Sequence, residues 1–330
     1  MPDKILVTGS AGHLGEALMR TLRAQGRAAV GIDVKPSPFT DQVGSIVDRD
    51  FVRESMAGVN AVLHSATLHK PHVATHSRQE FVDTNITGTL NLLEEAVAAG
   101  VDSFIFTSTT STFGDALRPP SDQPAAWITE DVTPIAKNIY GATKTAAEDL
   151  CRLFHRNNGL PCVVLRTSRF FPEDDDEPVR RDSFGRDNLQ VCELLYRRVD
   201  IADVVDAHLL AIGRAAELGF DKFIISATTP FRRDDLDRLR SDPSGALDFR
   251  VPGWREVFEA RGWRMLDEIE RVYVNDHARE RLGWHPAYDF QRAIHDLGQG
   301  CDHRSKLARA IGAKGYHETK YADGIFPVEP

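Results

Sequence analysis

The 330-residue sequence has few cysteines, no excess of positive charge and no long hydrophobic run. Its four cysteines form no Cys-x-x-Cys pair, so we expect free thiols in a reducing, cytoplasmic compartment. The formal net charge of -9 argues against a nucleic-acid partner. No apolar run reaches the length of a membrane span, and a strand pattern begins at Lys4, so we expect neither a membrane segment nor a signal peptide.

The chain instead alternates short apolar runs with longer segments of helical periodicity. Strand patterns cover residues 4–8, 28–33, 43–47, 60–64, 103–108, 161–165 and 222–226. Helical patterns cover residues 13–25, 81–99, 138–158 and 204–212. This alternation predicts an α/β fold, a Rossmann-type doubly wound parallel sheet with helices on both faces.

Two stretches interrupt the alternation and predict a second, smaller lobe. Residues 170–188 are rich in Pro, Asp and Arg, and short helices and loops dominate from residue 228 onward. We expect an NAD-binding domain over 1–168, to which 199–227 returns. A discontinuous C-terminal substrate lobe would then comprise 169–198 and 228–330. No pattern assigns a role to the tail 300–330.

A glycine-rich turn, Gly9-x-x-Gly12-x-x-Gly15, lies between the first strand and the first helix. Gly9 permits a tight turn, Gly12 lets the backbone approach a pyrophosphate, and Gly15 lets the helix pack closely. The helix N-terminus supplies N–H groups for the phosphates. Asp33 ends the second strand, where a carboxylate accepts hydrogen bonds from a ribose 2′-hydroxyl and repels a 2′-phosphate. The pattern predicts a nucleotide site that prefers NAD to NADP.

Tyr140 and Lys144 stand four residues apart in a helical pattern, so their side chains face the same way. A positive charge beside a phenol favours the phenolate, and we expect the pKa of Tyr140 to fall below its usual value of about 10. Such a phenol can exchange a proton with an alcohol or carbonyl oxygen.

With these pieces together, the chain resembles the extended short-chain dehydrogenase/reductases, specifically the NAD-dependent epimerase/dehydratase group. The resemblance covers about residues 4–226, with a weaker similarity at 281–286. The Gly-x-x-Gly-x-x-Gly spacing is specific to this superfamily among nucleotide-binding folds.

The resemblance implies a catalytic set of three residues. Tyr140 and Lys144 match the family's Tyr-x-x-x-Lys pair. Counting back from Gly114, the catalytic Ser/Thr position is Thr109, with Ser108 as the alternative one residue away. Tyr140 would act as general acid or base, Thr109 would orient the same substrate oxygen, and Lys144 would lower the pKa of Tyr140 and bind the nicotinamide ribose.

The resemblance also implies contacts with NAD along the carboxyl edge of the sheet. Asp48 and Arg49 fall where the family contacts adenine, residues 64–66 resemble its His-x-Ala-Ala segment, and Asn85 opens its Asn-x-x-Gly-Thr helix. The implied cofactor-binding set is Gly9, Gly12, His13, Leu14, Gly15, Asp33, Asp48, Arg49, His64, Ser65, Ala66, Asn85, Thr107, Tyr140 and Lys144.

The sequence departs from this family at positions that would select the substrate. Thr110 and Ser111 replace the Asp-Glu pair of dehydratases, so a dehydratase is not expected. Glu193 stands where sugar-nucleotide enzymes often carry an Arg that helps to hold a diphosphate. Residues 267–275 lack the Arg-Pro-Gly-Asp element of such enzymes. Both differences weaken the case for a nucleotide-diphosphate substrate.

Arginines are the candidate substrate ligands, together with Thr109. Arg166 and Arg169 lie where the family has a substrate-facing Arg-Pro-x-Asn segment, and Arg169 replaces its Asn. A guanidinium there would suit the carboxylate of a uronate or another acid, although it could equally be structural and face the acidic run 173–177. The insertion adds three arginines that either hold a diphosphate or are solvated loop charges: Arg180, Arg181 and Arg186.

The histidines raise the question of a metal site. His69, His72 and His76 have a spacing that could serve zinc, but contacts with cofactor and substrate are the simpler interpretation, and we expect no metal. His208 lies on an apolar helix and is expected to be packed. The acidic run 173–177 is expected to be a solvated loop.

These features predict NAD-dependent hydride transfer at a secondary alcohol or carbonyl carbon of a sugar or sugar nucleotide, most simply by an epimerase-like enzyme. One alternative is a net NAD-dependent dehydrogenase or reductase acting on a sugar acid or other small hydroxy compound. Another is a non-catalytic NAD-sensing scaffold, against which the intact Thr109, Tyr140 and Lys144 argue. The partners are then a small-molecule substrate and, by resemblance, a second copy of the chain, paired through helices 81–99 and 138–157 into a four-helix interface.

Overall fold

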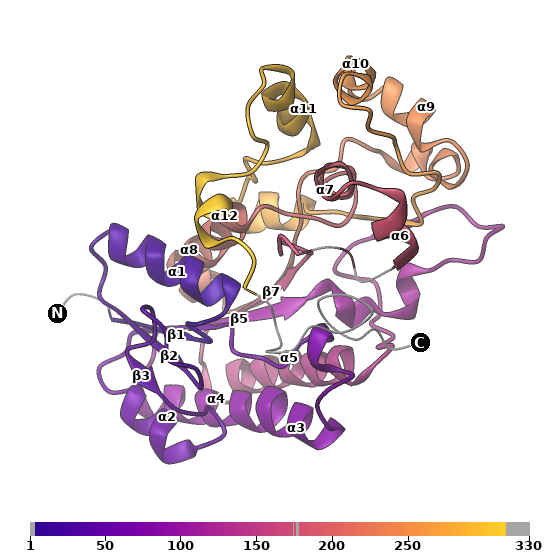
Figure 1. The fold of residues 1–330 in the computed structure, drawn as a ribbon. Coiled ribbons are helices and arrows are strands. Elements are labelled where there is room, and N and C mark those ends of the chain that lie inside the picture. Colours follow the sequence, from indigo (N-terminus) through magenta and orange to yellow (C-terminus); the bar gives the residue numbers. More distant parts are fainter. Residues whose placement is uncertain (1–3, 174, 176–177, 315–330) are drawn as a thin grey trace.

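The computed structural model describes residues 4–173, 175 and 178–314, and within them the chain builds a seven-stranded parallel sheet (Figure 1). In spatial order its strands are β3 (Gln42–Val43), β2 (Ala29–Asp33), β1 (Ile5–Thr8), β4 (Ala61–His64), β5 (Ser103–Thr109), β7 (Cys162–Thr167) and β8 (Phe220–Ile225). This confirms the predicted doubly wound α/β fold. The order of strands reverses between β1 and β4, the point at which such sheets bind ligands.

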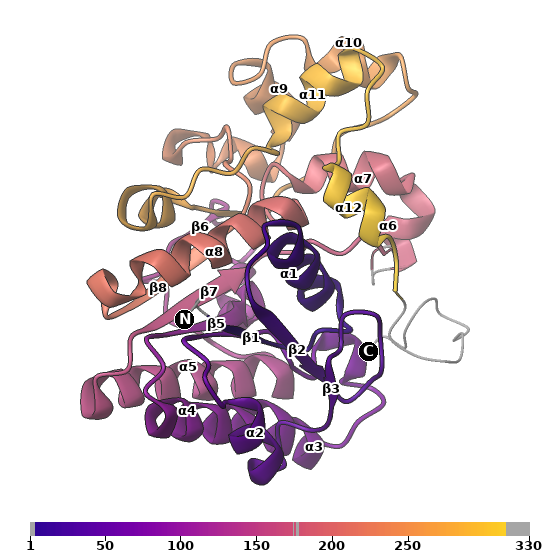
Figure 2. The same ribbon diagram turned by 90° about the vertical axis from the view of Figure 1, so that its left-hand side faces the viewer.

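The central strands read as continuous apolar runs because helices cover both faces of the sheet. One face carries α1 (His13–Ala24) and α8 (Ile201–Leu218), and the other carries α2 (Arg49–Ser55), α4 (Gly88–Ala99) and α5 (Ile139–Asn158). Figures 1 and 2 show these two layers on opposite sides of the strands.

Two predicted elements differ in extent from the observed ones. The strand predicted over 43–47 is only the two exposed residues of β3, because Ile46 leaves the sheet to pack under α2 and α4. The helix predicted over 204–212 is the longer α8, whose N-terminus is set by Asp200, a carboxylate that accepts from the N–H of Ala202 (2.8 Å).

The helix predicted over 81–99 contains an irregular turn. It starts as α3 (Arg78–Val82), capped by Ser77, passes through a π-helical turn at Asp83–Thr87 and continues as α4. In such a turn each hydrogen bond spans five residues and not the four of an α-helix, and these turns are frequent at functional sites. Here the turn carries Asn85 into the protein interior.

A second apolar core lies outside the sheet, in the part of the chain expected to form the substrate lobe. It is built by α7 (Arg186–Glu193), α9 (Pro243–Asp248), α10 (Trp254–Glu259), α11 (Phe290–Gly298) and a parallel pair of short strands, β6 (Ala126–Ile128) and β9 (Arg271–Tyr273). Figure 2 shows this lobe above α8 and α1.

The insertion predicted to be irregular contains two helices, α6 (Pro178–Ser183) and α7. That expectation was wrong because α7 buries polar side chains beside its apolar ones. Asn188, for example, exchanges hydrogen bonds with the main chain of Arg264 in the second lobe (2.9 and 3.1 Å). The burial of Asn188 therefore depends on a partner far away in the sequence.

Parts of the C-terminal half return to the first core. Trp284 packs there and donates its indole N–H to the main chain of Asp203 (2.9 Å), and α12 (Lys306–Ile311) packs along α1 and α8. The exact domain boundary therefore stays a prediction. The rest of the tail, 315–330, lies outside the described residues. Among the described helices, none combines the length and apolar character that a membrane span requires.

Candidate active site

The glycine turn has the geometry that its sequence predicts. Gly9 adopts φ +73°, and a Cβ there would lie 2.8 Å from the backbone of Ala66. A Cβ on Gly15 would lie 1.9 Å from the carbonyl oxygen of Gly9, so the helix can pack on the turn only without a side chain. Gly12 is the N-cap of α1 and supplies no side chain to cap its N–H groups. The positive end of α1 is thus left to a ligand.

Asp33 lies beside this turn at the end of β2. Its carboxylate accepts hydrogen bonds from the N–H of Ala11 (2.9 Å) and of Lys35 (2.8 Å). The acid is therefore held in place next to the phosphate-binding backbone, as a ribose-binding residue requires.

His64, Ser65 and Ala66 brace the turn from behind. Both ring nitrogens of His64 are occupied, by Thr8 Oγ1 (2.8 Å) and Thr89 Oγ1 (2.9 Å), and burial holds its pKa well below the usual range. Ser65 Oγ donates to the carbonyl of Thr8 (2.6 Å), and the N–H of Ala66 donates to Thr8 Oγ1 (3.1 Å). The expectation that the side chain of His64 contacts the cofactor is therefore wrong, because this neutral ring is committed to the core.

Asn85 acts in the same indirect way. Its amide accepts from Thr67 Oγ1 and the N–H of Leu68 (both 2.9 Å), and donates to the carbonyl of Leu68 (2.9 Å) and to Thr143 Oγ1 (3.0 Å). With its side chain saturated and buried, Asn85 does not contact the cofactor through its amide. It positions the segment after β4 against α5.

Other residues expected to contact the cofactor have structural partners in addition. Asp48 accepts from the N–H groups of Asp50 and Phe51 and so caps α2. Arg49 pairs with Glu94 and Glu95 on α4. Thr107 bonds His208 (Oγ1 to Nε2, 2.8 Å), whose fully buried ring confirms that it is packed. These contacts leave the cofactor roles of Asp48, Arg49 and Thr107 as predictions.

The expected catalytic residues meet at the carboxyl edge of the sheet. Thr109 ends β5, where its Oγ1 accepts from the N–H of Ser111 (3.1 Å), and its side chain lies near enough to the hydroxyl of Tyr140 on α5 to lower the pKa of that phenol. Ser108 points elsewhere and donates to Glu148 (2.6 Å). Thr109 is thus the hydroxyl that shares a site with Tyr140. Lys144 lies one turn further along α5, with its ammonium 4.0 Å from the ring centroid of Phe106, a cation–π contact.

The electrostatics of this pair differ from the expectation. Burial raises the pKa of Tyr140 to about 12, and the side chain of Thr109 opposes this only in part. Burial also lowers the pKa of Lys144 to about 7, with Glu148 acting in the opposite sense. The expected fall in the pKa of Tyr140 is therefore wrong for the protein alone, because removal from water outweighs the lowering effect of Thr109, the one opposing contact.

Arg166 is likewise misassigned as a substrate ligand. It is wholly buried, and its Nε and Nη2 hold the two carboxylate oxygens of Glu148 (2.9 and 2.6 Å). Its charge is satisfied inside the core, between β7 and α5. Arg166 therefore supports the site and does not bind substrate.

Arg169, Arg180 and Arg181 do come together in the insertion. Arg169 Nη1 pairs with Asp175 (2.9 Å), and Arg181 Nη1 donates to the carbonyl of Asp175 (2.6 Å). Arg180 Nη1 donates to the hydroxyl of Tyr196 (2.9 Å). Of the acidic run, Glu173 and Asp175 are buried, so for these two residues the expectation of a solvated loop is wrong, while 174, 176 and 177 lie outside the described residues.

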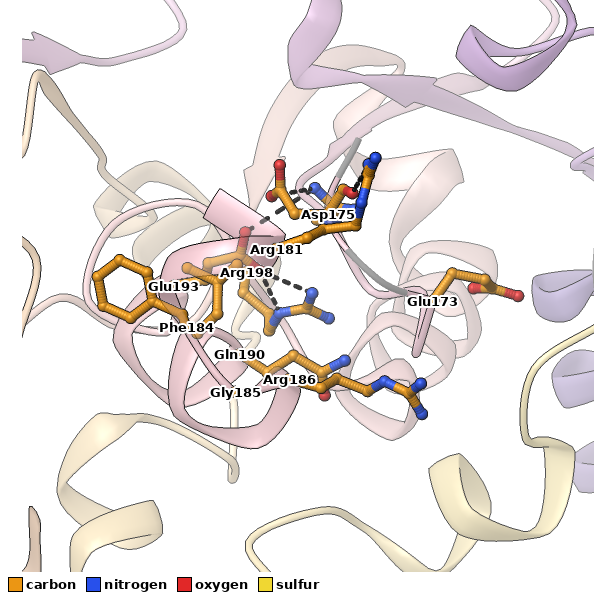
Figure 3. A pocket seen from close by; sticks show the side chains of 11 residues that line it. Glu173, Asp175, Arg181, Phe184, Gly185, Arg186, Gln190, Glu193 and Arg198 are labelled. Carbon is orange, nitrogen blue, oxygen red and sulfur yellow. Dashed lines mark hydrogen bonds and ion pairs between the residues drawn. The ribbon is translucent and has the colours of Figure 1, made fainter. Parts of the chain in front are cut away.

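Arg169, Asp175 and Arg181, but not Arg180, line a cavity of about 340 Å³, which we call the insertion pocket (Figure 3). Its charged lining is Arg169, Glu173, Asp175, Arg181, Glu193 and Arg198, with Arg186 alongside. Arg198 Nη1 donates to the carbonyl of Phe171 (2.8 Å). The ring of Phe171 lies 5.6 Å from that of His69, which in turn lies 6.5 Å from that of Tyr140, all between centroids. Phe171 and His69 thus connect Arg198 in the pocket with Tyr140 at the carboxyl edge of the sheet.

Two histidines near the site have the following contacts. The ring of His69 lies 6.5 Å from that of Tyr140, between centroids, in keeping with the expected contact with cofactor or substrate. The side chain of His13 pairs with Glu173 (Nε2 to Oε1, 2.9 Å), and its role at the cofactor stays a prediction. The rings of His69, His72 and His76 contact one another edge to face in succession. Over the residues that the structure describes, no three metal-ligating side chains come close enough to hold an ion.

Comparison with known proteins agrees with this geometry. The NAD dependent epimerase/dehydratase family matches residues 5–186. The UDP-glucose 4-epimerase of Rhizobium meliloti is 28% identical over 329 residues, covering 87% of this chain and 93% of that protein. A shorter match, 31% identical over 166 residues, covers 49% of the chain but only 39% of the uncharacterised protein y4nG of Sinorhizobium fredii.

Among solved structures, a short-chain dehydrogenase/reductase superfamily protein from Agrobacterium tumefaciens with bound NAD superposes with a TM-score of 0.63. It is 24% identical, and the match covers 90% of this chain and 96% of that one. That likeness shows the fold, and the family match extends over more than half of the sequence. The chain therefore belongs to the NAD-dependent epimerase/dehydratase family and is an NAD-dependent enzyme of the extended short-chain dehydrogenase/reductase type.

Proposed function

We propose that this enzyme transfers hydride between NAD and a secondary alcohol or carbonyl carbon of a sugar-type substrate, in an epimerase-like reaction without net formation of NADH. The observation that carries the proposal is the burial of Thr109 and Tyr140 together at the carboxyl edge of the sheet, close enough for the side chain of Thr109 to lower the pKa of the phenol. Two hydroxyls placed together there can both reach one substrate oxygen.

The chain's own residues divide the work. The backbone of Gly9, Gly12 and the N-terminus of α1 would bind the pyrophosphate, and Asp33 would bind the ribose. When bound, NAD would accept the hydride from the substrate carbon and, in its reduced form, return it. Tyr140 gives or takes the proton at the substrate oxygen, and Thr109 holds that oxygen in line.

Lys144 completes the set by binding the nicotinamide ribose and by placing positive charge near Tyr140. Since the pKa of Tyr140 lies at about 12 in the protein alone, the phenol is protonated at neutral pH. It is therefore ready to donate a proton to a carbonyl oxygen, which is the reducing half of an epimerisation.

A second candidate is a net dehydrogenase or reductase acting on a sugar acid or another small hydroxy compound. The insertion pocket favours it, because Arg169 lines a cavity small enough for such a molecule. An NAD-sensing scaffold without activity is the weaker reading, since a sensor has no use for Thr109, Tyr140 and Lys144 together.

One assay distinguishes these candidates. Purified protein is offered sugars, uronates and nucleotide sugars with NAD, while NADH absorbance and substrate stereochemistry are followed. Epimerised product with no lasting NADH supports the proposal. Accumulating NADH supports the dehydrogenase, and bound NAD without turnover across the panel supports the scaffold.

The assignment of Tyr140 has its own test. Tyr140→Phe removes the proton-transferring hydroxyl and keeps the ring, so turnover should fall by roughly two to four orders of magnitude. NAD affinity, measured by fluorescence titration, should stay close to that of the unaltered protein. Turnover equal to that of the unaltered protein would remove Tyr140 from the mechanism.

A further inference from the structure

The insertion pocket has an unusual charge arrangement, in which buried carboxylates hold the arginines. Glu193 is 1% exposed and binds Arg197 through Oε1 and Arg198 through Oε2, both at 2.6 Å. Arg169 lies 3.8 Å from the same carboxylate. Figure 3 shows Glu193 and Arg198 among the side chains that line the pocket.

A second buried carboxylate repeats the arrangement. Asp175 Oδ2 pairs with Arg169 (2.9 Å) and with Arg197 (2.6 Å), so Arg197 bridges Asp175 and Glu193. Guanidinium groups held this way already have their preferred planar, charge-assisted partners. An incoming anion would have to compete with the protein's own carboxylates.

A third carboxylate lies on the side of the pocket nearest the nucleotide turn. Glu173 is 4% exposed and pairs with His13 at the start of α1. Burial alone would raise the pKa of Glu173, but the contact with His13 and the N–H of Lys314 together lower it. The carboxylate is therefore ionised at neutral pH and, with Asp175 and Glu193, offsets most of the positive charge of the four arginines that line the pocket.

Glu193 is ionised for the same reason. Burial would raise its pKa, but the charges of Arg197, Arg198 and Arg169 outweigh burial and hold the pKa below its usual range. Three buried, hydrogen-bonded or ion-paired carboxylates thus line one cavity beside the catalytic edge.

We propose that the insertion pocket selects a free hydroxy substrate, a neutral sugar or a single-carboxylate sugar acid, and excludes substrates that carry a nucleoside diphosphate. This rests on the proposed function and names the substrate class of that same site. Glu193 is the specificity-determining residue, because it occupies the arginines and places a negative charge where a diphosphate would need a positive one.

Size and charge point the same way. The pocket volume of about 340 Å³ lies at the small end of the range found for ligand sites, about 300–1,000 Å³. A diphosphate carries more than one negative charge, and like charges brought together in a desolvated site repel strongly. A single carboxylate or a set of hydroxyls can instead share the hydrogen-bonding edges of the arginines.

The direct test is a calorimetric titration, in which UDP is added to the NAD-loaded protein and the heat of binding is measured. The expected result is binding weaker than a Kd of about 1 mM, equivalent to less than about 4 kcal/mol. Any tighter binding of UDP overturns the proposal, whatever the protein does catalytically. Because this measurement uses the unaltered protein, it stays decisive even if a variant fails to fold.

Glu193→Gln tests the residue itself. The amide keeps the shape of the side chain and one acceptor oxygen but removes the charge, so UDP affinity should rise by at least about tenfold. The matched control is Glu217→Gln, which neutralises an exposed carboxylate on α8 and should leave UDP affinity unchanged. An equal response of the two variants would remove Glu193 as the selecting group.

Turnover measurements keep this inference apart from the proposed function. With uronates and neutral sugars, hydride transfer should be detectable, while the matching UDP-sugars should give at least about tenfold lower kcat/KM. Higher kcat/KM on the UDP-sugars overturns the substrate class but leaves hydride transfer intact. Absence of turnover on every compound overturns the proposed function, and the UDP titration still decides the character of the pocket.

Discussion

Lys144 is a buried lysine whose surroundings lower the pKa of its ammonium group. Its ammonium is removed from water and faces the ring of Phe106 on one side, with Glu148 one helical turn away. Its folded-state pKa of about 7 lies far below its unfolded value, so at neutral pH the folded protein holds fewer protons on this group than the unfolded chain does.

The sign of the resulting pH dependence follows from that difference. Protonation of Lys144 opposes folding fully below pH 7, and this penalty shrinks as the pH rises from 7 toward the unfolded pKa. We expect Lys144→Met to raise the melting temperature by several degrees at pH 6 and by little at pH 10, while it abolishes turnover. Paired thermal scans across this range measure it. A gain that grows with pH would contradict the assigned pKa.

At this scale the sequence predicted which residues gather but not how they are buried. Local patterns located Tyr140, Lys144 and the glycines, since helical periodicity and turn chemistry are local, and the family resemblance then gave the Tyr140–Lys144 pair its role. The pKa of Tyr140 and the role of Arg166 were wrong. Both depend on burial by elements distant in the sequence, and no spacing rule reports the solvent that a side chain has lost.

The glycine turn and α1 act as one element. Gly15 has no room for a methyl group, since a Cβ would meet the carbonyl of Gly9 at 1.9 Å. Gly15→Ala should push α1 away from the turn, abolish NAD binding in a fluorescence titration and lower the melting temperature. Gly213→Ala on α8 is the control, because a Cβ there meets nothing within 4 Å, and it should bind NAD normally. Normal NAD binding by Gly15→Ala would refute the packing argument.

Glu148 ties the three catalytic elements together. It accepts from Ser108 on β5 and from Arg166 on β7, and it follows Lys144 on α5. The distances from Thr109 to Tyr140 and Lys144 are thus fixed by an ion pair beneath them. The sequence did not indicate this contact, because Ser108, Glu148 and Arg166 belong to three separate elements and no motif links them.

This ion pair is suited to a double-mutant cycle. Arg166→Met or Glu148→Met alone leaves a buried charge unpaired and should cost about 3–5 kcal/mol of unfolding free energy in urea titrations. The double variant should cost clearly less than the sum, because it removes both charges of the pair, and Lys144 loses the charge of Glu148 equally in the double variant and in Glu148→Met alone. Additive losses would mean that the two side chains act independently.

At the scale of the whole molecule, the parallel sheet and the presence of a second lobe could be predicted from the sequence, but the elements inside that lobe could not. Alternation of apolar runs and helical periods is a local signal repeated many times. The pairing of β6 with β9 joins residues that lie more than a hundred positions apart. Asn188 on α7 can be buried only because the carbonyl of Arg264 accepts a hydrogen bond from its side-chain amide. Such elements owe their stability to long-range contacts, and these contacts leave no periodic pattern of apolar residues in the sequence.

The assembly is the remaining prediction at this scale. The helices α4 and α5 lie side by side on one face of the sheet, and Leu153 on α5 is 38% exposed, a surface suited to pairing with a second copy. We propose a homodimer through these helices, with twice the monomer mass in light scattering.

Two leucines of nearly equal exposure decide where the partner binds. Leu153→Asp places a charge in the proposed interface and should shift the protein toward monomer, because a buried unpaired carboxylate is costly. Leu210 on α8, 40% exposed on the opposite face of the sheet, provides the matched change. Leu210→Asp should leave the mass unchanged. If the Leu210 variant dissociates and the Leu153 variant does not, the partner binds on the α8 side, and the four-helix arrangement is refuted.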